Sequence, residues 1–416
     1  MSFLESTGAP LGRLLNYPGF VRFLSARLLA SVAVQMQTVA VGWQVYAITG
    51  KPLDLGLIGL SQFLPFVLLV LPAGHVADRH NRAAILAGCM ALEFFCALAL
   101  LAFTLSGLAV VWPVFAVMVV FGIARAFSMP AGQAIMPNLV PPSLFSRGVA
   151  VNSSTWQVST IAGPAIGGLV YLAGPDIVYA TVAGLLAAAF LLIVGVKTDR
   201  PTRPAQPDSW HTLLEGLRFV WKKKVILGAV SLDLFAVLFG GAVALLPAYA
   251  SDILHVGPDG FGWLRAAPGI GAAIVAMTLA WRPITRHVGA QMFAGVAVFG
   301  TATVVFGVSH DFLLSLGALV VIGGSDMVSV YIRHMLVQLE TPDAIRGRVS
   351  AVNAVFIGAS NELGEFESGV TAAWWGLKPA VVVGGLASIA IAGLWMRWFP
   401  ALRRIDEFPE PATPRA

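Results

Sequence analysis

Apolar runs long enough to cross a lipid bilayer recur along the whole chain and constrain its fold more than any other feature. A helix needs about 20 mostly apolar residues to span the hydrocarbon core. Only 11% of the 416 residues are charged, against roughly a quarter in a soluble domain. The sequence therefore predicts an all-α membrane protein, with twelve transmembrane helices near 20–47, 54–76, 84–105, 111–136, 149–173, 176–196, 225–249, 259–281, 288–308, 312–336, 349–375 and 379–399.

One long polar stretch interrupts these runs and predicts the domain organisation. It contains Pro201, Pro204 and Pro207 and ends in an amphipathic piece from Trp210 to Lys224. We expect four regions: an N-terminal six-helix half at 1–196, a cytoplasmic linker with the amphipathic segment at 197–224, a C-terminal six-helix half at 225–400, and a cytoplasmic tail at 401–416.

A short internal repeat supports this division into halves. Pro142–Val149 reads PSLFSRGV and Pro342–Val349 reads PDAIRGRV, and Asn152 and Asn353 follow at similar spacing. Two helical repeats related by an axis along the membrane normal are a recurrent transporter architecture, with the ligand site near the midplane between them. The repeat therefore predicts two pseudo-symmetric six-helix bundles.

The distribution of Lys and Arg predicts the orientation in the membrane. Three arginines, Arg27, Arg125 and Arg265, fall within expected spans, and the expected outer loops hold only Lys51 and Lys378. All other Lys and Arg residues, Arg333 included, are assigned to the inner segments. Because cytoplasmic loops of membrane proteins carry an excess of basic residues, we expect a multi-pass protein of the cell (inner) membrane with both termini in the cytoplasm.

Two motifs resemble signatures of the major facilitator superfamily. The loop after the second expected span reads Gly74-His75-Val76-Ala77-Asp78-Arg79-His80-Asn81-Arg82, similar to the superfamily's G-x-x-x-D-R-x-x-R signature. The fifth expected span holds Gly163-Pro164-Ala165-Ile166-Gly167-Gly168, which resembles the G-P-x-x-G-G element of its antiporter branches. Thr341–Arg348 and Ser360–Glu365 are similar to the enterobactin-exporter-like branch, which includes multidrug exporters.

The resemblance implies roles for both motifs. Gly74, Asp78, Arg79 and Arg82 would form an inner gate, whereas the simpler reading is a solvated loop whose charges only orient the chain. Because small residues on one strip allow close contact between helices, the glycines of the second motif favour a tight seam. Gly163, Gly167 and Gly168 would form it with Pro164, and ordinary helix packing is the alternative.

Ionisable residues within the expected spans are the best candidates for chemistry, because burying a charge in a membrane is costly. A carboxyl group removed from water favours its neutral form and can take up and release a proton. The resemblance implies a proton-coupling role for Arg125, although Met129 stands where the family has glycine. A structural ion pair is the alternative for Arg125, and a structural hydrogen-bond network between helices is the alternative for the acids. The acids within the spans are Glu93, Asp233, Asp326, Glu362, Glu365 and Glu367, and the proton-coupling candidates are Asp233, Glu362, Glu365, Arg125 and Asp326.

These observations favour a secondary transporter over an enzyme. The chain contains no G-x-x-x-x-G-K-[ST] phosphate-binding loop, no convergent nucleophile and base, and no metal-ligand pattern, so we expect no cofactor. We predict a proton-coupled exporter (antiporter) of amphiphilic small molecules such as siderophores or drugs, working by alternating access as a monomer. Its partners would be the substrate, protons and membrane lipid, not nucleic acid. An uptake carrier or a non-transporting receptor on the same scaffold is the alternative.

Overall fold

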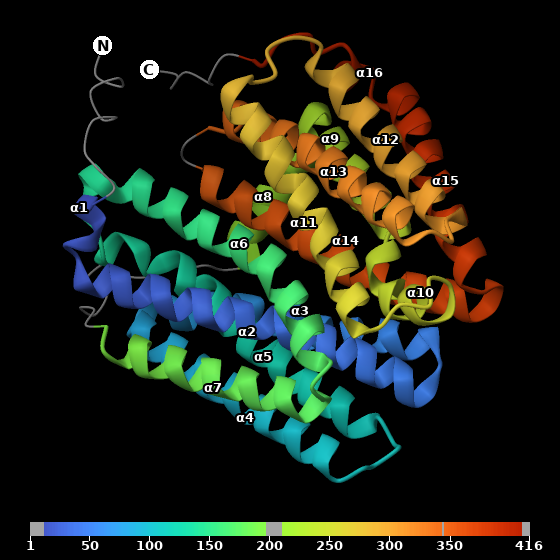
Figure 1. The fold of residues 1–416 in the computed structure, drawn as a ribbon. Coiled ribbons are helices and arrows are strands. Elements are labelled where there is room, and N and C mark those ends of the chain that lie inside the picture. The colour runs from blue at the N-terminus through green and yellow to red at the C-terminus, as the bar shows by residue number, and fades with distance from the viewer. Residues whose placement is uncertain (1–11, 197–209, 343–344, 410–416) are drawn as a thin grey trace. The chain divides into compact units, whose positions relative to one another are not determined.

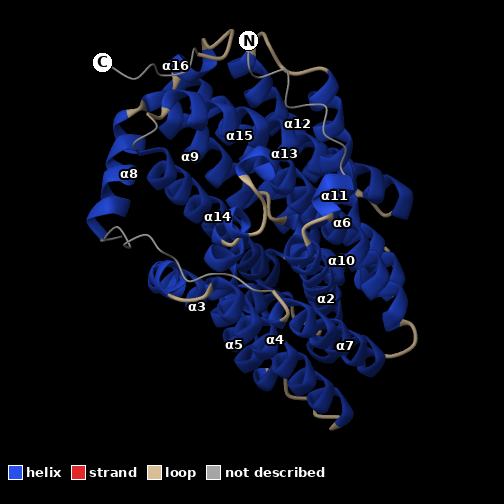
Figure 2. Cartoon of the chain, turned by 90° about the vertical axis from the view of Figure 1, so that its left-hand side faces the viewer, coloured by secondary structure: helices blue, strands red, loops and turns tan. Residues whose placement is uncertain are grey.

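The computed structural model describes residues 12–196, 210–342 and 345–409, and every regular element among them is a helix (Figure 2). Contacts between residues divide the chain into two compact units. The first unit comprises Met1–Gln44 and Leu64–Gln206, and the second comprises Val45–Phe63 and Pro207–Ala416. The expectation of an all-helical chain is thus confirmed for the residues described.

Proline or a polar capping residue marks the start of several helices of the first unit. Pro18 and Pro175 each occupy the first position of a helix, where no backbone N–H is needed. Asn81 caps the fourth helix by accepting hydrogen bonds from the backbone N–H groups of Ala83 and Ala84 at 2.9 and 3.2 Å. The elements are α1 (Gly12–Leu15), α2 (Pro18–Thr49), α3 (Pro52–Arg79), α4 (Arg82–Leu105), α5 (Trp112–Ala134), η2 (Met136–Asn138), η3 (Pro142–Leu144), α6 (Phe145–Tyr171) and α7 (Pro175–Val194).

The second unit contains the remaining helices and Val45–Phe63, which is the end of α2 and the start of α3. Within it, α13 packs against both α11 and α12 (Figure 1). Its other elements are α8 (Trp210–Lys222), α9 (Lys224–Phe239), η4 (Ala242–Leu245), α10 (Leu246–Asp252), α11 (Pro258–Trp281), α12 (Val288–Val308), α13 (Phe312–Glu340), α14 (Arg346–Trp375), α15 (Leu377–Trp398) and α16 (Pro400–Arg403).

Each unit has its own apolar core. In the first unit, Phe23 of α2, Leu86 of α4 and Ile193 of α7 belong to one buried cluster. In the second, Phe293 of α12 and Leu336 of α13 belong to another. The large side chains at the centre of each unit therefore come from several different helices.

Among the residues that the structure describes, ten segments are long and apolar enough to cross a membrane. They include α2, α4, α5 and α7 of the first unit, and α9 with α10 counts as one segment. Two further helices, α6 with 27 residues and α14 with 30 residues, have sufficient length but contain more polar residues and are not among the ten. Twelve spans and two six-helix bundles accordingly stay predictions.

The seventh expected span, 225–249, is not one continuous helix. It breaks after Phe239 at Gly240 and Gly241, and the chain then continues through η4 into α10. The broken end lies tightly against α15, because a Cβ atom added to Gly384 would stand 2.2 Å from the carbonyl oxygen of Phe239. The sequence prediction missed the break because the residues on both sides of the glycines are equally apolar.

The amphipathic segment expected at Trp210–Lys224 forms α8, which ends at Lys222. Its buried face packs within the second unit, where Val220 lies in one apolar cluster with Ile226 of α9 and Val349 of α14. Residues 197–209 of the expected linker lie outside the described residues. The four-region division stays a prediction.

Candidate functional site

A buried ion pair joins two helices of the second unit. Arg333 of α13 donates through Nη1 to Oδ2 of Asp233 on α9. The Arg333 side chain is 2% exposed and that of Asp233 is 5% exposed. Ser329, one turn before Arg333, donates from Oγ to the other carboxylate oxygen, Oδ1, at 3.3 Å. Both oxygens of Asp233 are therefore bound in a nearly water-free place.

A second carboxyl group belongs to the same cluster. Asp326 lies seven residues before Arg333, about two helical turns, and within electrostatic reach of both Asp233 and Arg333. Two acids thus share one guanidinium group. With both acids ionised the cluster carries an uncompensated negative charge, and one bound proton would balance it. Asp233, Asp326, Ser329 and Arg333 are called the paired-acid cluster below.

Arg333 corrects the count of basic residues made from the sequence. That count placed Arg333 among the cytoplasmic residues, but it lies inside α13 and is buried against Asp233. Because the expected outer loops hold only Lys51 and Lys378, moving Arg333 into the span leaves the basic excess on the other side nearly unchanged. The spacing of seven residues from Asp326 was the signal that could have identified it.

Glu365 lies in another contact set of the second unit. Oε1 of Glu365 on α14 is 3.9 Å from Nη2 of Arg265 on α11. Arg265 also donates from Nη1 to the carbonyl oxygen of Val243 in η4 at 3.4 Å. Gly59 of α3 makes room for the acid, because a Cβ atom there would stand 2.7 Å from Oε2 of Glu365. This pair therefore links α14 and α11 to the broken helix, while Glu362 and Glu367 are half-buried on α14.

The first unit has a different set of internal charges. Glu93 of α4 is buried and lies within electrostatic reach of Arg125 of α5. The guanidinium carbon of Arg125 is 5.6 Å from the centre of the Phe66 ring, a cation–π distance. Arg27 of α2 lies against Gly132 of α5, where an added Cβ atom would stand 2.6 Å from its Nη1. Glu93, set aside from the coupling candidates on sequence grounds, is thus the buried acid of this unit.

The residues of the expected inner gate lie where α3 ends and α4 begins. Arg82 donates from Nη1 to the carbonyl oxygen of Ala134, at the end of α5, at 2.7 Å and to Oδ1 of Asn138 at 3.0 Å. Asp78 is half-buried, Arg79 is exposed, and a Cβ atom on Gly74 would meet open space. Among the motif's side chains, Arg82 thus links the α3–α4 turn to a neighbouring helix end.

The glycines of the second motif lie against α2. A Cβ atom on Gly163 would stand 2.5 Å from Cβ of Gln35, and one on Gly167 would stand 2.9 Å from Cα of Met36. Pro164 lies inside α6, and Gly168 is buried. The two helices approach closely enough at this strip to exclude any larger residue at Gly167.

The family assignment follows from the whole chain. A family model described as transmembrane secretion effector matches residues 9–413. The chain belongs to this family of the major facilitator superfamily. It is similar to the multidrug efflux pump Tap of Mycolicibacterium fortuitum, with 26% identity over 93% of this chain and 97% of the relative. It is also similar to the enterobactin exporter EntS of Escherichia coli O139:H28, with 24% identity over 97% of each chain.

Solved structures of other major facilitator transporters share the fold. A bacterial homologue of the human lysosomal transporter Spinster matches with a TM-score of 0.70 and 14% identity, over 92% of this chain and 95% of that one. A POT family transporter in complex with a thioalcohol-conjugated peptide matches with a TM-score of 0.72 and 13% identity, over 92% and 96%. The family, its relatives and these neighbours are transporters, and the chain is a membrane transporter and not an enzyme.

The structure of this major facilitator protein groups the predicted coupling residues into separate sets. Asp233 and Asp326 share one cluster with Arg333, whereas Glu365 pairs with Arg265. Arg125 belongs to the first unit with Glu93. The prediction from sequence named both aspartates but missed the arginine and the serine that hold Asp233.

Proposed function

We propose that this transporter is a proton-coupled exporter of amphiphilic small molecules that works by alternating access. The observation that carries the proposal is the paired-acid cluster, in which two carboxyl groups share one buried arginine. Taking up a proton at this cluster changes its charge in a place where an unbalanced charge is costly. A change in protonation can therefore shift the protein between conformations that differ in how the cluster is solvated.

The test is flux driven by a pH gradient in vesicles that contain the purified chain. Asp326→Asn removes a titrating group and leaves the Asp233–Arg333 pair intact. We expect it to abolish flux driven by the pH gradient while substrate exchange without a gradient continues. Asp259→Asn, in the first turn of α11, is the matched control and should transport normally. Unchanged gradient-driven flux in Asp326→Asn would remove this acid from the mechanism.

Testing the roles of Asp233 and Glu365 needs a different set of variants. Neutralising Asp233 removes the carboxylate that Arg333 bonds directly and leaves Asp326 as its acidic neighbour, so loss of transport in Asp233→Asn is interpretable only beside the double variant Asp233→Asn/Arg333→Gln. Glu365→Gln keeps the shape of the side chain beside Gly59. We expect both the double variant and Glu365→Gln to remain folded and to lose gradient-driven efflux. Normal efflux in both would exclude these acids.

The substrate class follows from the relatives as a proposal. Tap and EntS are named for multidrug efflux and enterobactin export, so a drug and a siderophore are the two candidates. Carboxylates favour a cationic drug, whereas arginines favour an anionic siderophore. A thermal-shift screen with both classes, followed by vesicle flux on the compounds that bind, decides between them.

The proposal also includes the orientation of the chain in the membrane and the direction of transport. We infer that both termini are cytoplasmic in the inner membrane, from the scarcity of basic residues in the expected outer loops. Labelling of single cysteines at Lys51 and Lys378 by an impermeant reagent in intact cells tests this. Export is inferred from the relatives, and net accumulation of substrate in cells against its gradient would instead favour an uptake carrier. Ligand binding without flux would favour a receptor.

A further inference from the structure

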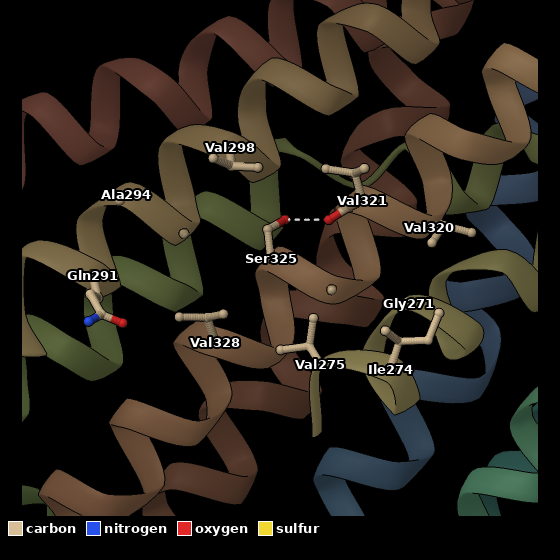
Figure 3. A pocket seen from close by; sticks show the side chains of 12 residues that line it. Gly271, Ile274, Val275, Gln291, Ala294, Val298, Val320, Val321, Ser325 and Val328 are labelled. Carbon is tan, nitrogen blue, oxygen red and sulfur yellow. Dashed lines mark hydrogen bonds between the residues drawn. The ribbon is translucent and has the colours of Figure 1, made fainter. Parts of the chain in front are cut away.

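An apolar groove runs between α11, α12 and α13 of the second unit. Its volume is 480 Å³, within the range of about 300–1,000 Å³ typical of small-molecule sites. Figure 3 shows Ile274 and Val275, Ala294 and Val298, and Val321 among the side chains that line it. None of the coupling candidates contributes to it. The groove is therefore a feature separate from the charge clusters.

The polar side chains in the groove are already occupied. Ser325 donates from Oγ to the carbonyl oxygen of Val321 on its own helix at 2.8 Å, the dashed line in Figure 3. Gln291 donates from Nε2 to the carbonyl oxygen of Arg286 at 3.0 Å. The walls thus present mainly hydrocarbon to whatever occupies the groove.

Glycine residues let the helices that form this groove approach closely. The backbones of α11 and α13 touch where a Cβ atom on Gly271 would stand 1.8 Å from the carbonyl oxygen of Val320. Gly271 and Gly324 leave the floor without side chains. Ile274 and Val298 are 49% and 46% exposed. Exposed apolar side chains on membrane-spanning helices are those that contact lipid tails.

At one end the groove continues to a basic loop. A second hollow of 450 Å³ shares Val275, Gln291 and Val328 with the first and is lined by Arg282, Arg286 and His287 of the α11–α12 loop. Trp281, immediately before Arg282, is 89% exposed. Tryptophan is enriched at the membrane–water interface. If Trp281 lies at the membrane surface, the basic end is level with lipid headgroups and the apolar part is level with acyl chains.

Two of the three basic side chains already have acidic partners from the segment after α16. Nε of Arg286 is 3.7 Å from Oε1 of Glu407, and Nδ1 of His287 is 2.7 Å from Oδ1 of Asp406. Arg282 forms no ion pair with any residue that the structure describes. The Arg282 guanidinium group is thus available to an anionic headgroup at this end of the groove.

We propose that this groove binds one anionic phospholipid, with an acyl chain lying in the groove along α11 and α13 and the phosphate at Arg282. Asp406 and Glu407 compete with the headgroup for the neighbouring basic residues. The site depends on the chain lying in a membrane and not on the direction or coupling of transport.

The experiment is native mass spectrometry of the purified, delipidated full chain. It is titrated with phosphatidylglycerol or with phosphatidylcholine of identical acyl chains. We expect one phosphatidylglycerol molecule to bind in preference to phosphatidylcholine. Arg282→Ala should weaken this binding about fivefold, since one basic residue near an anionic lipid contributes about 1 kcal/mol. Ala294→Phe, which fills the groove from its exposed α12 side, should prevent it.

Matched controls separate the site from general effects of charge and bulk. Arg404→Ala removes an exposed charge after α16, and Ala390→Phe adds the same bulk at an exposed position of α15. Both should bind the lipid normally, and Asp406→Asn/Glu407→Gln should bind it more tightly. Gel filtration checks that each variant is folded. Because Arg282 is exposed, Arg282→Ala tests the site without disturbing the packing of the helices.

Three outcomes would overturn the proposal. Equal binding of the two lipids would rule out a preference for anionic headgroups. Equal losses of binding in Ala294→Phe and Ala390→Phe would rule out the groove as the binding site. Displacement of bound phosphatidylglycerol by inorganic phosphate at equal concentration would show that the acyl chain contributes nothing to binding. Because the readout is lipid retention, a failure of proton coupling leaves this result unaffected.

Discussion

The two units differ in the sign of the charge inside their long helices. Away from the helix ends, the described residues of the first unit include two arginines, Arg27 and Arg125, and one buried acid, Glu93. In the second unit, Arg265 and Arg333 accompany five acids, which are Asp233, Asp326, Glu362, Glu365 and Glu367. A region with more carboxyl groups than cations has sites for protons, whereas a region with more cations does not. The comparison favours the second unit as the place of the proposed proton coupling.

The largest expected effect is on stability, from breaking the buried pair of the second unit. Arg333→Gln leaves Asp233 buried without its partner, and we expect a loss of about 3–5 kcal/mol in the free energy of unfolding. Reversible unfolding in SDS, followed by tryptophan fluorescence, measures this. The double variant Asp233→Asn/Arg333→Gln should recover most of the loss. A single variant as stable as the parent would show that the pair carries little energy.

A steric change in the first unit should have the next largest effect. Gly167→Leu places a side chain against the backbone of Met36 on α2, and overpacking of this kind costs about 1–3 kcal/mol. The same SDS titration measures the loss. Gly184→Leu on α7, where an added Cβ atom meets open space, is the control and should leave stability unchanged. Equal stability of the two variants would contradict close packing between α6 and α2.

Breaking the partly exposed pair of the second unit should cost less. The side chains of Arg265 and Glu365 are 21% and 29% exposed, and ion pairs with access to water contribute about 1 kcal/mol or less. We expect Arg265→Gln to reduce stability by no more than that. The contrast with Arg333→Gln measures how much burial strengthens an ion pair in this unit. Losses of equal size would indicate that burial does not distinguish them.

The smallest effect should come from the acid of the first unit. Glu93→Gln keeps the size of the side chain, and we expect flux driven by a pH gradient to stay within about twofold of the parent, equivalent to about 0.4 kcal/mol. The vesicle assay used for Asp326→Asn measures it. Loss of gradient-driven flux in Glu93→Gln, with exchange preserved, would assign proton coupling to the first unit and reverse the comparison.

Much of the helical architecture could be predicted because hydropathy and helix breakers act locally. The prolines and glycines near Pro52, Gly174 and Gly257 bound helices close to the expected positions. The helix break at Gly240 and Gly241 could not be predicted from the sequence, since it depends on where α15 and its Gly384 lie in space. The polar residues that lower the hydropathy of α6 and α14 also explain why the number of spans is still open.

The charges of the candidate site were identified more easily than their partners. Asp233 and Asp326 are conspicuous in apolar sequence, so composition alone revealed them. Arg333 lies near the end of an apolar run, where basic residues ordinarily face the cytoplasm, and this general tendency concealed its pairing. The contact between Arg265 and Glu365 joins residues about 100 positions apart, and no local pattern encodes it.

Arg82 connects two helix ends through hydrogen bonds to acceptors that do not ionise. Its guanidinium group is held by the peptide carbonyl oxygen of Ala134 and by the amide oxygen of Asn138, and neither acceptor titrates in the physiological range. These two hydrogen bonds between the α3–α4 turn and the end of α5 therefore do not depend on the ionisation of their acceptors. Arg82 thus joins two helix ends through neutral oxygen atoms, whereas Arg333 and Arg265 of the second unit face carboxylates.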